Sequence, residues 1–294
     1  MTLYIQLLLN TLQIGSVYML FALGLTLIFG VMKVVNFAHG TFFTAAALAI
    51  ATVMPPAMYQ LGLPVWAAYL IAFVAALAVV AAIGIVVYQF GFQKFLRDLI
   101  GSFILSIGLV LFLNGSYLAI FGGAPQKVPP LIDVNLSIFG AYITGQRLLL
   151  VLVAVGVTVG LYWLIQKTKL GLSLRAVAED QEAAMLQGIQ YRRVALYGFL
   201  IGTVLAAIAG AMMAPVHAIT TVIGDEFLIK AFIIIIVGGL GSVGGAIIGA
   251  FLIAFIESVG GYYFDNSTAT IAMFVLVMVV LLLRPQGIMG HAER

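Results

Sequence analysis

The first 32 residues carry no charged side chain, and the apolar run that begins at Leu3 continues to about Met32. A bilayer hydrocarbon core of about 30 Å is crossed by a helix of about 20 apolar residues. Such runs recur along the chain, which is 64% hydrophobic and only 8% charged. A soluble domain carries about 25% charged residues, so water cannot be the main solvent of this chain. These features predict a polytopic α-helical membrane protein.

The apolar runs divide the chain into candidate spans. We expect an all-α bundle of about eight spans, at about residues 3–30, 41–56, 63–90, 99–122, 148–166, 194–216, 229–256 and 267–283. Polar or glycine-rich sequence interrupts two of the runs, at 34–43 and 237–249. Non-helical backbone at membrane depth persists only where protein or a water-filled cavity satisfies it, which predicts broken or re-entrant segments there. No polar interval could hold a soluble domain, so we expect a single transmembrane domain over residues 1–294.

Lysine and arginine residues are unevenly distributed between the loops. Lys94, Arg97, Lys167, Lys169, Arg175, Arg192 and Arg193 lie in two loops, against two basic residues in the loop between them. Because cytoplasmic loops carry an excess of positive charge, 90–98 and 167–193 are predicted to be cytoplasmic. Eight complete crossings would place both termini outside, with Arg284 and Arg294, and a re-entrant segment would change this parity.

The segment RAVAEDQEAAMLQGIQYRR, residues 175–193, contains six charged side chains. Asp180 suits the N-cap of a short helix, and Gly188 suits its C′ position, with Ile189 folding back on the helix. A helix of about seven residues is marginal in isolation, so this chain or a partner must hold it. Two interpretations remain open: an ordinary charged loop, or a coupling helix that docks on another subunit through residues 183–186.

Asn36 and His39 lie in the first interruption. Unpaired polar groups in hydrocarbon cost several kcal/mol, so both side chains must find partners. One interpretation is a structural helix break, in which they bond to exposed backbone. The other is that they line a translocation path.

Glycines dominate the second interruption. No Lys-Ser or Lys-Thr pair follows the last glycine, so the run is not a phosphate-binding loop of the Walker type. Residues 239–244 permit a sharp backbone break, and Gly245 and Gly249 predict close packing of helices. The same packing is expected of Gly156 and Gly160, and of the stripe Ala206, Gly210 and Ala214.

The remaining charges near the spans have simple interpretations. Lys33, Lys230 and Glu257 lie near span ends, where snorkelling explains them. Asp225 and Glu226 are expected to cap the helix that follows them. No acid–base pair or metal cluster occurs within a span and cysteine is absent, so we expect neither an enzyme nor a metal site. The basic residues lie in loops between spans, so nucleic acid is not an expected partner.

Four motifs, taken together, resemble one family of transport proteins. They are NFAHG at 36–40, RAVAEDQEAAMLQGIQYRRV at 175–194, KAFIIIIVGGLGSVGGAIIGA at 230–250 and LLLRPQGIMG at 281–290. In this order they are similar to motifs of ABC importer permeases for branched-chain amino acids, of the type that bears NFAHG. One departure is Thr41, where the family often has Glu.

The resemblance implies a permease subunit of an ATP-driven importer in the bacterial cytoplasmic membrane, which moves branched-chain or similar small amino acids by alternating access. It implies, besides membrane lipid, three kinds of partner: a second related permease, two cytoplasmic ATP-binding subunits and an extracytoplasmic solute-binding protein. ATP would be bound by the partner subunits, and no cofactor is expected in this chain.

The resemblance also assigns roles to residues. The segment 167–193 would couple the permease to the ATPases. Its contact residues would be Arg175, Ala176, Glu179, Asp180, Ala183, Ala184 and Gly188. The translocation path would include Asn36, His39, Gly40, Gly239, Gly241 and Ser242.

Other functions remain open from the residues alone. The resemblance also leaves open an importer of the same class that carries urea, short amides or other small organic solutes. An ATP-independent channel or secondary transporter would need its own pore or ion site and no partner helix. A membrane scaffold without transport would tolerate changes at Glu179 or Gly188.

Overall fold

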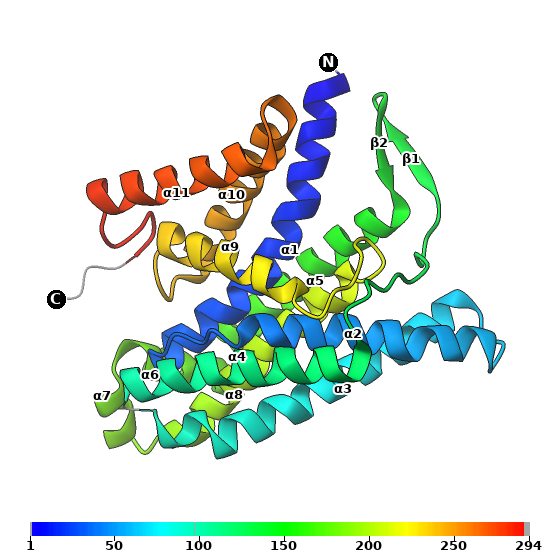
Figure 1. Cartoon of the computed structure of the whole chain (residues 1–294). Helices are drawn as coiled ribbons and strands as arrows, with labels where there is room; N and C mark the ends of the chain where they lie inside the picture. The colour runs from blue at the N-terminus through cyan, green and yellow to red at the C-terminus, as the bar shows by residue number, and fades with distance from the viewer. Residues whose placement is uncertain (1, 97, 291–294) are drawn as a thin grey trace.

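The computed structural model describes residues 2–96 and 98–290, so Arg97 and Arg294 lie outside the described residues. The described residues form eleven α-helices, one short 3-10 helix and one β-hairpin (Figure 1). Seven of the helices are long and apolar enough to cross a membrane by length and composition. The predicted class, a polytopic helical membrane bundle, is therefore confirmed.

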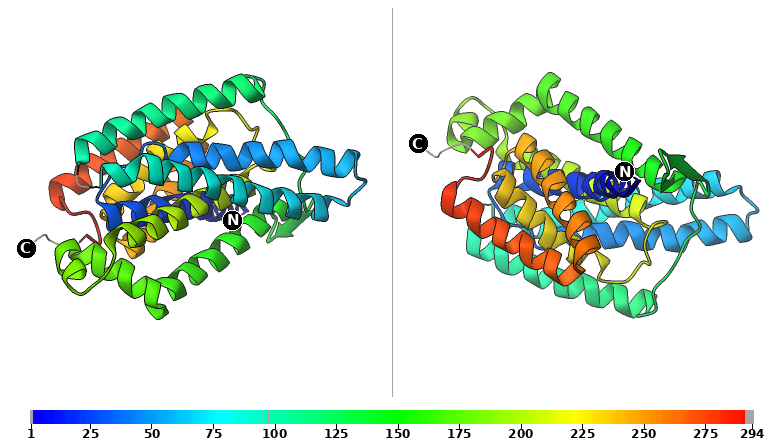
Figure 2. Two further views of the ribbon diagram at one scale, coloured as in Figure 1. Left: turned by 90° about the horizontal axis from the view of Figure 1, so that it is seen from below. Right: turned by 90° about the horizontal axis from the view of Figure 1, so that it is seen from above.

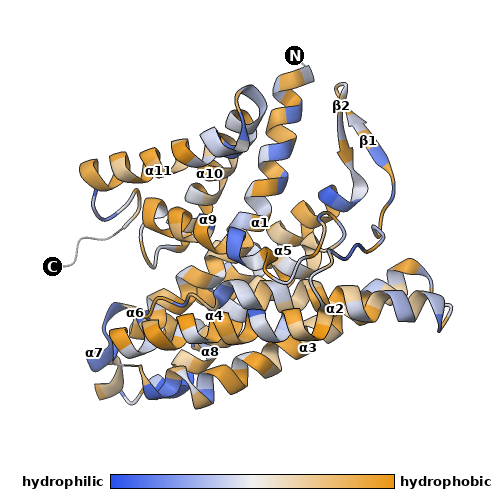
Figure 3. Ribbon diagram, in the orientation of Figure 1, coloured by the Kyte–Doolittle hydropathy of each residue, from blue (hydrophilic) through white to orange (hydrophobic). Residues whose placement is uncertain are grey.

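Nine of the helices are long. They are α1 (Thr2–Met32), α2 (His39–Tyr59), α3 (Val65–Phe90), α4 (Leu99–Phe121), α5 (Gly145–Lys167), α8 (Tyr191–Met213), α9 (Ile223–Gly238), α10 (Val243–Tyr263) and α11 (Asn266–Leu283). The short elements are the 3-10 helix Phe92–Lys94, β1 (Asn135–Ile138), β2 (Ala141–Thr144), α6 (Lys169–Glu179) and α7 (Gln181–Leu186). Figure 3 shows the long helices mostly hydrophobic, with hydrophilic residues gathered at α7.

Helix α1 lies at the centre of the bundle and packs against α8, α9 and α10. Glycines let the helices approach closely, as in membrane proteins generally. A Cβ on Gly210 of α8 would meet the carbonyl oxygen of Phe43 on α2 at 2.3 Å, which confirms the packing predicted for this stripe. For Gly156 and Gly160 the prediction is wrong within this chain, because a Cβ on either residue would meet nothing within 4 Å.

The two ends of the bundle differ. The α2–α3 hairpin points away from α6 and α7, which lie at the opposite end of the molecule (Figures 1 and 2). A cleft brings Lys33, at the end of α1, together with Leu96 and Glu182. The loops 90–98 and 167–193 thus lie at one end of the bundle, the end that the positive-inside rule assigns to the cytoplasm.

The predicted span 229–256 is not one continuous helix, and the break predicted within 237–249 is confirmed. The chain reverses at residues 239–242, because Gly239 and Gly241 have φ angles of 108° and 81°, which favour glycine. Helices α9 and α10 form an antiparallel pair, in which a Cβ on Gly238 would meet the Gly245 carbonyl oxygen at 2.3 Å. A Cβ on Gly249 would lie 2.8 Å from the carbonyl oxygen of Ile234, so the predicted packing of Gly245 and Gly249 is confirmed.

This reversal changes the expected positions of the chain ends. Near the amino terminus, the Gln6 side chain bonds to the backbone of Tyr142 in the hairpin between α4 and α5. Near the carboxyl terminus, residues 284–290 return to the end that holds α6 and α7 (Figure 2). The nine long helices are an odd number, so the amino and carboxyl termini lie at opposite ends of the bundle. Arg284 therefore lies at the same end as the basic loops 90–98 and 167–193.

The β-hairpin was not predicted from the sequence. Its strands pair antiparallel, with Ile138 opposite Ala141. Phe139 and Gly140 form the two-residue turn with φ angles of 49° and 83°. Two positive φ angles are typical of a type I′ turn, whose twist matches that of the strands. The hydrogen bonds between Gln6 and the Tyr142 backbone hold this hairpin against the start of α1.

Candidate coupling surface and translocation elements

Helix α7 is a six-residue helix with a defined cap at each end. Asp180 Oδ1 accepts hydrogen bonds from the backbone N–H groups of Glu182 and Ala183, at 2.9 and 3.0 Å. At the other end, Gly188 has a φ of 83°, and Ile189 N–H donates to the Ala184 carbonyl oxygen at 3.1 Å. The predicted N-cap and Schellman motif are both confirmed.

The segment before α7 is a second helix, which was not predicted. Thr168 caps α6 by accepting a hydrogen bond from Gly171 N–H at 3.0 Å. A Cβ on Gly171 would lie 2.2 Å from the carbonyl oxygen of Leu164, so α6 folds back directly against the end of α5. Leu174 and Val177 are buried on the inner face of α6. The predicted coupling segment is therefore anchored on this chain's own spans.

The predicted coupling residues differ in exposure. Five are exposed: Arg175, Glu179, Asp180, Ala183 and Gly188. Ala176 is half-buried. Ala184 is buried at 4% exposure because the inner face of α7 packs on this chain, so it does not lie on an open docking face. Leu186, by contrast, is 86% exposed.

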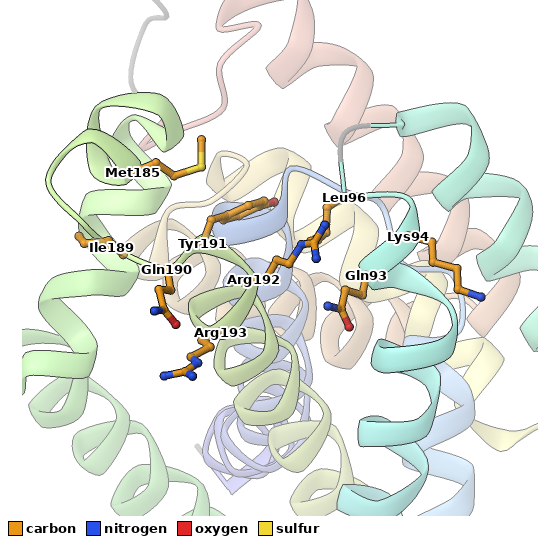
Figure 4. A pocket seen from close by; sticks show the side chains of 9 residues that line it. All are labelled: Gln93, Lys94, Leu96, Met185, Ile189, Gln190, Tyr191, Arg192 and Arg193. Atoms are coloured by element: carbon orange, nitrogen blue, oxygen red, sulfur yellow. The ribbon is translucent and has the colours of Figure 1, made fainter.

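An open groove of about 810 Å³ borders α7 (Figure 4). Met185 and the start of α8 form one side of it, and the residues that follow α3 form the other. The groove is basic, since Lys94, Arg192 and Arg193 are among its lining residues. Tyr88 of α3 donates a hydrogen bond to the Arg192 carbonyl oxygen at 2.6 Å and ties the two sides together.

Residues 33–38 connect α1 to α2 without helical structure. Asn36 and His39 are both fully buried. Asn36 Oδ1 accepts from Ala38 N–H at 3.0 Å, and His39 Nε2 lies 3.2 Å from the Phe21 carbonyl oxygen. The first bond satisfies part of the broken backbone, and the second holds the His39 side chain against α1. That Asn36 and His39 line a translocation path remains a prediction.

The other residues predicted to line the path lie at two places where helices of the bundle meet. A Cβ on Gly40 would meet the Gly224 carbonyl oxygen at 2.6 Å, so α2 and α9 cross here. Gly239 and Gly241 form the turn between α9 and α10, and Ser242 caps α10 by accepting from Gly245 N–H at 3.1 Å. Their packing roles are clear, and their place in a path stays a prediction.

Two polar contacts within the bundle were missed by the sequence interpretation. Lys230 of α9 pairs with Glu257 of α10, with 2.5 Å between Nζ and Oε1. Asp225 does not cap α9 and instead accepts a hydrogen bond from Asn114 Nδ2 of α4 at 2.9 Å. The signal for the first contact was present: opposite charges on two apolar runs joined by a glycine turn.

Comparison with known protein families covers nearly the whole chain. Residues 7–283 match the model of the family described as the branched-chain amino acid transport system permease component. The chain belongs to this family. No solved structure matches it.

The relatives of this permease are similar along their length. It is 32% identical to the high-affinity branched-chain amino acid transport system permease protein BraD of Pseudomonas aeruginosa, over 99% of this chain and 97% of BraD. It is 28% identical to the corresponding protein LivH of Escherichia coli K12, over 99% and 96%. The fructose import permease protein FruF of Bifidobacterium longum is 27% identical, over 93% of this chain and 76% of FruF. Together with its apolar helices, these relatives show that this permease is a multi-pass membrane protein.

Proposed function

We propose that this chain is the transmembrane subunit of an ATP-driven importer that moves branched-chain or similar small amino acids across the cytoplasmic membrane by alternating access. It works with a second related permease, two cytoplasmic ATP-binding subunits and an extracytoplasmic solute-binding protein. ATP is bound and hydrolysed by the partner subunits, and this chain itself catalyses no reaction. Residues 1–294 act as one permease domain, with 167–193 as its coupling segment.

The observation that carries this proposal is the construction of α7. A six-residue helix is too short to be stable by itself, but both ends of α7 are capped. The caps let α7 move as one unit when a partner displaces it. Its Leu186 is 86% exposed and lies at the basic end of the bundle. A large apolar side chain in that position is suited to a pocket on a cytoplasmic partner.

Movement of α7 would be transmitted to the end of α1, which lies next to it. Gln181 and Glu182 border a cleft with Met32 and Lys33, at the end of α1. The broken segment 33–38 follows immediately, and α1 itself packs against α8, α9 and α10. Binding of ATP to the partners would thus bias the central helix between two positions. A coupling free energy of about 1–3 kcal/mol between nucleotide and transport sites is typical of such systems.

Reconstitution of the complete complex in proteoliposomes tests the proposal. With loaded binding protein on one side and ATP on the other, we expect leucine uptake that stops when ATP is replaced by a non-hydrolysable analogue. The two permeases without ATPases should give no solute flux. ATP-independent flux would instead favour a channel or secondary transporter and would reject the proposal. A panel of urea, short amides and sugars, offered to the same complex, distinguishes the alternative solutes.

A further inference from the structure

Three helices bring one charged cluster together inside the bundle. The Lys230 ammonium of α9 lies 2.5 Å from Glu257 Oε1 of α10, and the Tyr18 hydroxyl of α1 donates to Glu257 Oε2. Lys230 Nζ also lies 5.3 Å from the centre of the Tyr18 ring, within cation–π range. The two charged side chains remain 25% and 21% exposed.

Snorkelling does not explain this pair. Glu257 lies well inside α10, six residues before its last residue, Tyr263, and Lys230 lies in the middle of α9. The Lys230 ammonium turns toward a carboxylate rather than toward the end of its helix. Charges within membrane helices are costly, and they face water-filled cavities or protein and commonly mark solute pathways. Because such charges avoid lipid, the partial exposure of the pair points to a face lined by water or by protein.

An apolar wall lies beside the charges. The Tyr18 ring meets Phe227 edge to face at 5.9 Å between centroids, and Phe227 stacks on Phe43 at 4.5 Å. Opposite charges next to aromatic rings match the two parts of an apolar amino acid. One part is a zwitterionic head group, and the other is a hydrocarbon side chain.

We propose that Lys230 and Glu257 bind the carboxylate and ammonium groups of a zwitterionic α-amino acid during its passage. The apolar side chain of the amino acid then lies against Tyr18 and Phe227. This inference rests on the proposed function and names the substrate class at a specific site. In the present structure the pair is closed, and the substrate opens it by inserting its own charges.

The exchange of partners explains selectivity. When a zwitterion enters, Lys230 and Glu257 each exchange one oppositely charged partner for another, so no charge is left unpaired. A sugar or urea would separate the pair without replacing either charge, which is strongly unfavourable in a partly buried site. The closed pair therefore selects for solutes that carry both charges.

The test uses the complete complex in proteoliposomes and compares two readouts, leucine uptake and ATP hydrolysis stimulated by the loaded binding protein. The double variant Lys230→Met with Glu257→Met removes the pair but leaves no unpaired charge. We expect stimulated hydrolysis to stay within about twofold of wild type, while leucine uptake per ATP falls about tenfold or more. Asp225→Asn, which removes a carboxylate elsewhere on α9, is the matched control and should leave the ratio unchanged.

Several outcomes would overturn the inference. If the double variant takes up as much leucine per ATP as the wild type, the pair has only a structural role. Apolar residues often replace a buried ion pair without loss of stability, so this result would reject substrate binding by the pair. Should the double variant not assemble, the same ratio is measured for Glu257→Gln, which keeps the size of the side chain. Assembly failure in both variants also rejects the inference. Absence of ATP-dependent leucine uptake in the wild-type complex would instead reject the proposed function.

Discussion

The backbones of Gly24 and Gly202 touch where α1 crosses α8. A Cβ on Gly24 would lie 2.5 Å from the Gly202 carbonyl oxygen, and a Cβ on Gly202 would lie 2.6 Å from the Gly24 carbonyl oxygen. Small residues at both positions allow the helices to approach at van der Waals distance, which drives association where the hydrophobic effect is absent. The central helix is therefore positioned by a contact that no larger residue could make.

Gly202→Ala should destabilise the bundle by about 1–3 kcal/mol, because overpacking forces α1 and α8 apart. The measurement is the fraction of protein that remains folded after heating in detergent. Gly160→Ala is the control, since a Cβ there meets nothing within 4 Å and a mid-helix alanine is favoured over glycine. Equal melting of the two variants would contradict the role of the crossing.

Asp180→Ala should loosen α7 without affecting the spans. The loss of an N-cap costs about 1 kcal/mol, and the N–H groups of Glu182 and Ala183 lose their acceptor. We expect faster amide hydrogen exchange at these two positions and reduced leucine uptake by the complex. Asp180→Asn, which keeps a capping oxygen, should restore both. Unchanged exchange in Asp180→Ala would show that the cap does not hold the helix.

The order of the nine long helices predicts opposite sides for the two chain ends. The chain contains no cysteine, so single introduced cysteines report position without background. Phe139→Cys, at a site that is 85% exposed, should react with an impermeant maleimide from outside. Leu186→Cys and Met289→Cys should react only from the cytoplasmic side. Labelling of Met289→Cys from outside would contradict the split of 229–256 into two helices.

Local signals in the sequence were sufficient for some features. The caps of α7 at Asp180 and Gly188 follow from the chemistry of short helices, since each side chain or backbone angle acts within four residues. The packing of Gly245 also followed from spacing alone. Hydropathy alone counted 229–256 as one span, because the turn at 239–242 contains only glycine, leucine and serine and carries no charge. The glycines predicted a break there but not that the chain reverses.

Contacts between distant segments could not be predicted in the same way. Asp225 was expected to cap a helix, but in the folded chain it accepts a hydrogen bond from Asn114 of α4, 111 residues away in the sequence. The pairing of Lys230 with Glu257 depends on the reversal between α9 and α10, which the sequence interpretation left open. The burial of Asn36 and His39 likewise depends on how distant helices pack around them in the folded chain.

Position 188 offers the sharpest test of whether a cytoplasmic ATPase moves α7. The φ of 83° at Gly188 is compatible with Asn but not with Val, whose β-branched side chain is strained there. Leucine uptake is measured for complexes that contain Gly188→Val or Gly188→Asn at equal permease levels in the membrane. We predict that Gly188→Val abolishes uptake and that Gly188→Asn largely keeps it. Normal uptake by the Gly188→Val complex would contradict the account.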